Sequence, residues 1–87
     1  MVTAHLVNAS PMAIECDFTF NNQKFRAYLY KEARPHPYLD LDVGFTRCCI
    51  CRENTTVPEY DTTDVELSMD GIILCIEDFT GQLAKME

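Results

Sequence analysis

The chain contains no tryptophan, only three glycines in 87 residues, and no apolar run close to the length of a membrane span. So few glycines leave no loop of the kind that cradles a phosphate, and the GxGxxG and Walker patterns are absent. The patterns HExxH and GxSxG of common hydrolases are absent too. A membrane-spanning helix needs about 20 mainly apolar residues. We therefore expect neither an enzyme with a bound cofactor nor a membrane protein.

Basic residues are scarce in the second half of the chain. The whole sequence has 7 Lys and Arg against 14 Asp and Glu, a net charge of −7. From Glu53 to Asp78 there are eight acidic residues and no Lys or Arg. A field of this sign repels phosphate backbones and favours basic partners. We expect a protein partner with a basic surface and no direct contact with nucleic acid; an acidic face that only keeps the protein soluble is the alternative.

Five cysteines make an odd number without spaced pairs, which argues against a secreted disulfide scaffold. The first residues also lack the basic and apolar regions of a signal peptide. Reduced thiols and a cytoplasmic location are expected. The length suits one hydrophobic core, so residues 1–87 are expected to form a single small acidic domain.

Two β-hairpins are predicted. The first joins an alternating strand over residues 12–20 to a strand over 24–31 through Asn21-Asn22-Gln23, with Phe25, Ala27 and Leu29 facing inward. The second joins residues 65–69 to 72–77 through Asp70-Gly71, the strongest two-residue turn signal in the chain.

Between the hairpins, prolines predict a loop over residues 32–37, followed by a strand over 39–43 with a bulge or bend at Gly44. Extended chain then continues over 45–52, and a long loop is expected over 53–64. Residues 78–87 can form a short helix. The fold class is mainly β, with α+β as the alternative: an antiparallel sheet of five to six strands arranged as a sandwich or a barrel-like meander.

Cys48 and Cys51 have the CxxC spacing that allows two thiolates to bind one Zn²⁺. A structural zinc site needs two more ligands, and the candidates are Cys75, His36, Cys16 and Cys49, the first two being the preferred pair. No second paired motif accompanies them. The competing interpretation, which we favour, is that Cys16, Cys48 and Cys75 are small buried apolar residues on neighbouring strands. No metal and no cofactor are therefore expected.

Without a catalytic motif, the leading hypothesis is a non-catalytic binding or inhibitor protein. Size, acidity and β content suggest an accessory protein of a phage or prophage, acting in the host cytoplasm. Its acidic face would imitate DNA and block an enzyme of nucleic-acid handling or defence. The alternative class is a small zinc-binding structural or adaptor domain using Cys48 and Cys51, and a homodimer is a further possibility. The residues expected to contact a partner are Asp61, Asp64, Glu66, Tyr60, Tyr28, Tyr30 and Tyr38.

Overall fold

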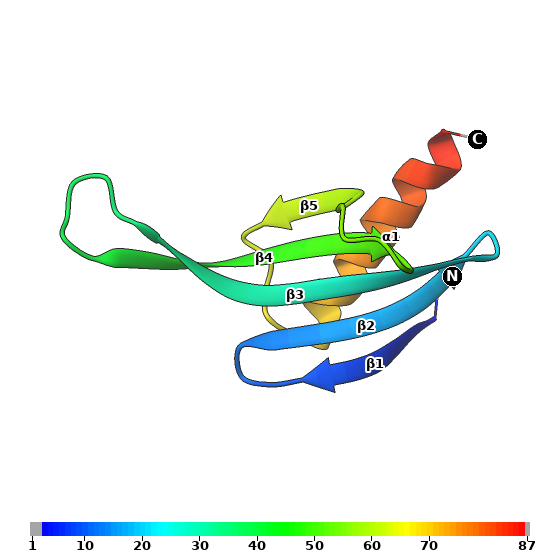
Figure 1. Cartoon of the computed structure of the whole chain (residues 1–87), viewed down its shortest axis with the longest axis horizontal. Helices are drawn as coiled ribbons and strands as arrows, with labels where there is room; N and C mark the ends of the chain where they lie inside the picture. The colour runs from blue at the N-terminus through cyan, green and yellow to red at the C-terminus, as the bar shows by residue number, and fades with distance from the viewer. Residues whose placement is uncertain (1–2, 87) are drawn as a thin grey trace.

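A computed structural model describes residues 3–86. Five antiparallel strands form one open sheet in the order β1-β2-β3-β4-β5, and one helix follows them (Figure 1). The strands are β1 Ala4–Ala9, β2 Ala13–Phe20, β3 Gln23–Pro35, β4 Asp42–Arg52 and β5 Tyr60–Thr63, and the helix α1 spans Met69–Lys85. The mainly β prediction is confirmed. Because each strand pairs with the next along the chain, the sheet is a meander, but it stays open, so the sandwich or barrel closure expected from the sequence is wrong.

The first predicted hairpin is confirmed in its strands and in its turn. β2 and β3 pair from Ala13 with Tyr30 to Phe20 with Gln23. The connecting Asn21 and Asn22 have φ angles of 52° and 63°, the left-handed geometry that a two-residue hairpin turn requires and that asparagine tolerates.

The core lies between one face of the sheet and α1. Inward residues of β2, β3 and β4 alternate with outward ones, and Phe18, Phe25 and Phe79 form its aromatic centre, with Phe25 and Phe79 ring centroids 5.2 Å apart. From α1, Ile72, Ile76 and Phe79 reach this centre at the three- and four-residue spacing of one helix face. The opposite face of the sheet, called here the open face, carries no helix and is turned toward the viewer in Figure 1.

The second predicted hairpin is wrong, because residues 69–85 form a helix. Ser68 caps the helix by accepting a 3.1 Å hydrogen bond from the Gly71 amide. Gly71 does not form a hairpin turn but allows the backbone of Glu66 to lie close to the helix, since a Cβ at position 71 would lie 2.0 Å from the Glu66 carbonyl oxygen. The short helix expected over 78–87 is thus the second half of a longer one.

Four smaller predictions are also corrected. β3 continues to Pro35, so the expected loop over 32–37 is mostly strand, and the strand expected over 39–43 begins only at Asp42. Proline is tolerated there because the strand ends at that pair. Gly44 pairs with Ala33 without a register shift, while a bulge occurs in the unpredicted strand β1, between Leu6 and Asn8. β5 lies inside the loop expected over 53–64.

Candidate partner-binding site

The predicted acidic cluster is divided between two faces of the sheet. Asp61 lies on the open face, where it accepts hydrogen bonds of 2.8 and 2.5 Å from Arg47, and Glu32 lies 3.5 Å from the same guanidinium. The hydrogen bond from Arg47 is the main reason that the pKa of Asp61 is lowered. Asp61 therefore carries a charge that is already compensated.

Asp64 and Glu66 lie on the other side, near the helix. Together with Asp78 they line a groove of about 370 Å³ between β5 and α1, whose walls also include Tyr60 and Leu74. Among residues 3–86, no basic side chain forms an ion pair with these three carboxylates. Leu74 is 65% exposed although it is a large apolar residue. This site, called here the β5–α1 groove, combines uncompensated negative charge with apolar surface.

Local hydrogen bonds fix the rim of the β5–α1 groove. Asp64 has a φ of 65°, which turns the chain out of β5 toward the helix. Glu66 accepts a 3.1 Å hydrogen bond from the Ser68 hydroxyl, and Asp78 accepts one of 2.7 Å from the Tyr60 hydroxyl. The two hydroxyl donors therefore hold the carboxylates of Glu66 and Asp78 near their positions in the groove.

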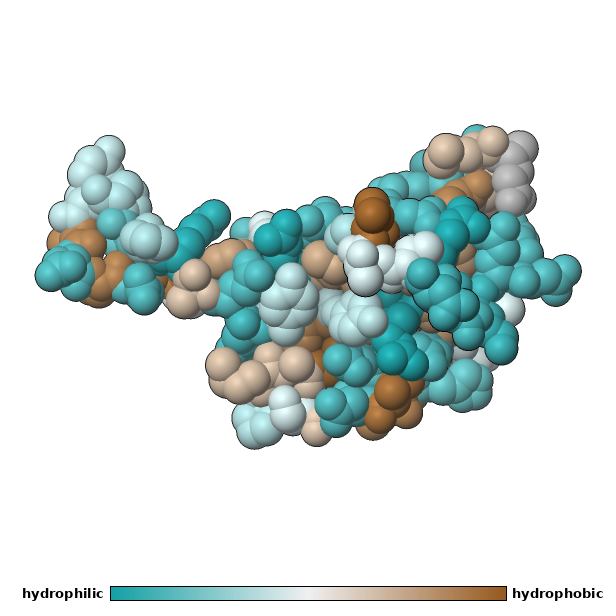
Figure 2. Space-filling view, viewed as in Figure 1, coloured by the Kyte–Doolittle hydropathy of each residue, from teal (hydrophilic) through white to brown (hydrophobic). Residues whose placement is uncertain are grey.

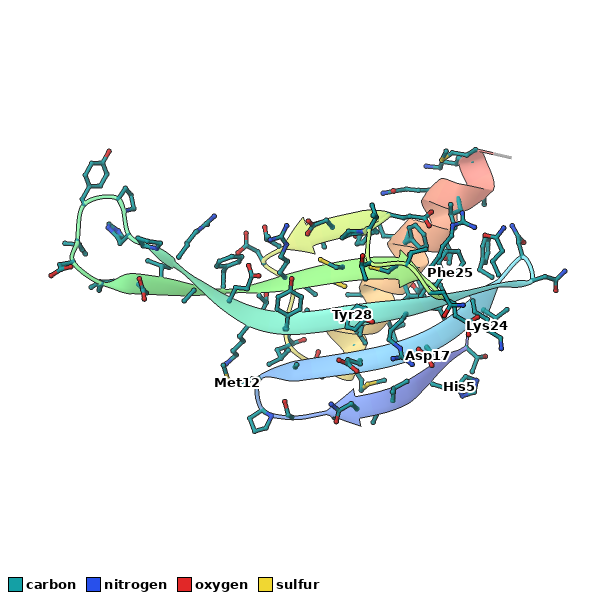
Figure 3. The ribbon with its side chains drawn as sticks, viewed as in Figure 1. His5, Met12, Asp17, Lys24, Phe25 and Tyr28 are labelled. Atoms are coloured by element: carbon teal, nitrogen blue, oxygen red, sulfur yellow. The ribbon has the colours of Figure 1, made fainter. Side chains whose placement is uncertain are left out.

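The four tyrosines expected to contact a partner lie in three different parts of the structure. Tyr28 and Tyr30 are half-buried on the open face and line a second groove of about 380 Å³ with Cys49 and Pro58 (Figure 3 labels Tyr28). Burial raises the pKa of Tyr30 to about 12. Tyr60 packs edge-on against Phe79 in the β5–α1 groove, with ring centroids 5.9 Å apart. Tyr38 is 91% exposed, and its ring lies edge-on to that of His36, with ring centroids 6.2 Å apart.

Tyr38 lies at the end of an arm formed by β3 and β4, which continue as a pair beyond the other strands (Figure 1). The arm comprises residues 31–46. Its end exposes the apolar residues Leu39 and Leu41. Figure 2 shows hydrophobic surface at this end of the molecule. The Nδ1 atom of His36 accepts hydrogen bonds of 3.1 Å from the amides of Tyr38 and Leu39, so this histidine orders the turn.

The residues considered as zinc ligands lie in different parts of the structure. Cys48 faces the helix and contacts Cys75, whereas Cys51 lies three positions along the same strand and faces the open side. His36 is at the end of the arm. Among the residues that the structure describes, no three His, Cys, Asp or Glu side chains are grouped to hold a metal ion. The CxxC spacing here reflects a strand that is buried on both faces.

Charge is segregated across the molecule. Six Lys and Arg residues precede position 53, and all of them lie on β3 and β4. Three of these, Arg26, Arg47 and Arg52, form ion pairs with carboxylates. From Asp64 to Asp78 there are five acidic residues and no basic one. Negative charge without a partner is therefore concentrated on the segment before α1 and on the helix itself.

Sequence reasoning missed Asp78 and Leu74 as parts of the β5–α1 groove. It assigned residues 72–77 to a strand, which leaves no helix face for these side chains to share. The signal was present in the spacing of Ile72, Ile76 and Phe79, which is helical and turns Leu74 and Asp78 to the outside.

Comparisons with protein-family models, with curated proteins and with solved structures found no match to this chain. Within residues 3–86 there is no helix of sufficient length and apolar character to cross a membrane.

Proposed function

We propose that this chain is a non-catalytic binding protein that occupies a basic surface of a larger protein. The β5–α1 groove is the contact site. The observation that carries the proposal is that Asp64, Glu66 and Asp78 surround this groove without an ion-pair partner among residues 3–86. A partner that supplies Lys or Arg side chains gains complementary charge, which favours both fast association and specificity.

The walls of the groove support the same kind of partner. Lys and Arg side chains have apolar stems that lie along hydrophobic surface while their charged ends reach carboxylates. Leu74 offers such a surface beside Asp78.

The finer form of the proposal concerns the identity of the partner. A fixed row of carboxylates can imitate the phosphates of a nucleic acid, so the basic groove of an enzyme that handles nucleic acids is the target that suits this surface. An accessory protein of a phage or prophage, which blocks a defence enzyme in the host cytoplasm, fits this description. The proposal rests on charge and shape.

The test is affinity capture with two variants of equal charge. The groove variant is D64N/E66Q/D78N, whose amides keep an acceptor for the Ser68 and Tyr60 hydroxyls and suit the left-handed φ of residue 64. The control is D40N/D42N/E53Q, which removes three exposed carboxylates elsewhere.

We expect the groove variant to retain about one tenth or less of the basic protein captured by the wild type at about 50 mM salt, while the control retains it. Equal capture by the wild type and the groove variant would overturn the proposal. Identification of the captured protein by mass spectrometry then tests its finer form.

A further inference from the structure

The outer edge of β5 is open to a further strand. β5 is last in the strand order, so only one of its edges is paired among residues 3–86. The Asp64 amide donates a 3.0 Å hydrogen bond to the Thr46 carbonyl of β4. Along an antiparallel strand, residues whose backbone groups point toward the neighbouring strand alternate with residues whose backbone groups point away from it. The N–H and C=O groups of Asp61 and Thr63 therefore point away from β4, toward the free edge.

This edge borders the β5–α1 groove. Tyr60 of β5 and Leu74 of α1 line the same groove, with Asp64, Glu66 and Asp78 around it. A strand added beside β5 would extend the sheet over the part of α1 where Leu74 is left exposed. Every second side chain of that strand would point into the groove.

We infer that the partner contributes an extended segment that joins the sheet as a sixth strand at β5 and points alternate Lys or Arg side chains into the β5–α1 groove. The inference rests on the proposed function and adds the mode of recognition. Strand addition obtains its affinity from main-chain hydrogen bonds and its specificity from pockets for alternate side chains. Charge complementarity selects the occupant, because the three groove carboxylates have no ion-pair partner within the described residues.

The other sheet edge lacks this combination. β1 has a bulge between Leu6 and Asn8, and bulges twist an edge away from regular pairing. The grooves found beside β5 and on the open face do not include any residue of β1. A basic strand would find at β1 neither a continuous ladder nor the carboxylates.

The experiment uses a synthetic peptide of about six residues in which lysine alternates with valine, a pattern suited to a strand with one basic face. A control peptide has the same sequence with N-methyl groups on alternate amides, which block main-chain hydrogen bonds and leave the charge unchanged. Binding is measured by fluorescence anisotropy, and amide hydrogen exchange at Asp61 and Thr63 is followed by NMR.

Two substitutions at one position complete the design. Thr63→Pro removes an edge N–H and Thr63→Val keeps it. We expect the unmethylated peptide to bind the wild type and the Val variant and to slow exchange at both amides. Binding of the methylated peptide to the wild type, and of the unmethylated peptide to the Pro variant, should each be about tenfold weaker. A tenfold change is what the loss of one to two net hydrogen bonds would cause.

The possible failures are distinguishable. If both peptides bind equally well and exchange is unchanged, the groove binds basic side chains without strand addition, so this inference falls while the proposed function stands. If D64N/E66Q/D78N binds the peptide as tightly as the wild type does, both fall. If the two amides are protected without peptide in a concentration-dependent dimer, the occupant is a second copy of this chain, and the inference is wrong.

Discussion

The Tyr60 hydroxyl donates a 2.7 Å hydrogen bond to the Asp78 carboxylate and thereby links β5 to α1 across the β5–α1 groove. The two residues are 18 positions apart in the sequence and belong to the last strand and the helix. The ring of Tyr60 also packs against Phe79, so the same side chain contributes to the core and to the groove wall. Stability and the shape of the proposed contact site are therefore coupled at this residue.

Replacing Tyr60 by Phe keeps the ring contact and removes the hydrogen bond. We expect a loss of about 1 kcal/mol in the free energy of unfolding, measured by urea denaturation. Tyr38→Phe is the control, because that side chain is 91% exposed and its loss of a hydroxyl should leave stability unchanged. Equal effects of the two substitutions would contradict the link between β5 and α1.

Tyr60 also predicts a change of stability with pH. Burial, and then the hydrogen bond to Asp78, raise the pKa of its phenol well above the usual value of 10.0. The folded protein thus holds this proton more tightly than the unfolded chain does, and its contribution to stability is complete below pH 10.0 and declines as the pH rises further. Between pH 9 and about pH 12, the free energy of unfolding measured by chemical denaturation should decline less steeply with pH in Tyr60→Phe than in the wild type. Identical slopes would count against this role of Tyr60.

Asp61 should behave differently from the groove carboxylates, since it is paired with Arg47 on the open face. Asp61→Asn is expected to change stability at pH 7 by less than about 1 kcal/mol, because exposed ion pairs contribute little. The lowered pKa of Asp61 means that this small contribution is present above pH 3.8 and is lost as the pH falls below it. Capture of the partner should remain at the wild-type level; a loss equal to that of D64N/E66Q/D78N would show that both faces bind.

Two glycines of α1 offer a matched test of the fold. Gly71→Ala would place a Cβ 2.0 Å from the Glu66 carbonyl oxygen, and we expect a loss of about 3 kcal/mol. Gly81→Ala meets nothing within 4 Å and should stabilise the helix by about 0.5–1 kcal/mol, because alanine loses less backbone entropy there. Thermal unfolding of the two variants checks both signs. A tolerated alanine at position 71 would contradict the close approach of residue 66 to the helix.

Local patterns were sufficient for the first hairpin. The alternation over residues 12–20, the two asparagines and the inward Phe25, Ala27 and Leu29 all lie within one short segment, and each part of the pattern favours the same structure. The prediction that Cys16, Cys48 and Cys75 are buried in the core is also confirmed, since free cysteine packs as a small apolar residue.

The prediction of the second hairpin is wrong because two sets of local signals in this segment favour different structures. Val65 and Leu67 alternate as in a strand, and Asp70-Gly71 is typical of a turn. Yet Ser68 provides a helix cap, and Ile72, Ile76 and Phe79 have helical spacing. Packing of that apolar face on the sheet decides in favour of the helix, and such contacts between distant segments are not visible in a short window of sequence.

The acidic cluster shows the same limit in the candidate site. Asp61 and Asp64 are three residues apart, but the alternation of a strand and the left-handed turn at Asp64 separate their faces. Asp78 joins Asp64 and Glu66 only because α1 crosses behind the sheet. Charge predicted the sign of the surface, and the fold determined which carboxylates share it.

The most direct test of the central claim is the salt dependence of the dissociation constant for the captured partner, measured for the wild type, D64N/E66Q/D78N and D40N/D42N/E53Q. We predict that binding of the wild type and of the control weakens steeply as salt rises, and that the groove variant binds more weakly with a flatter dependence. The same affinity and the same salt dependence in all three proteins would contradict the assignment of the β5–α1 groove as the partner-binding site.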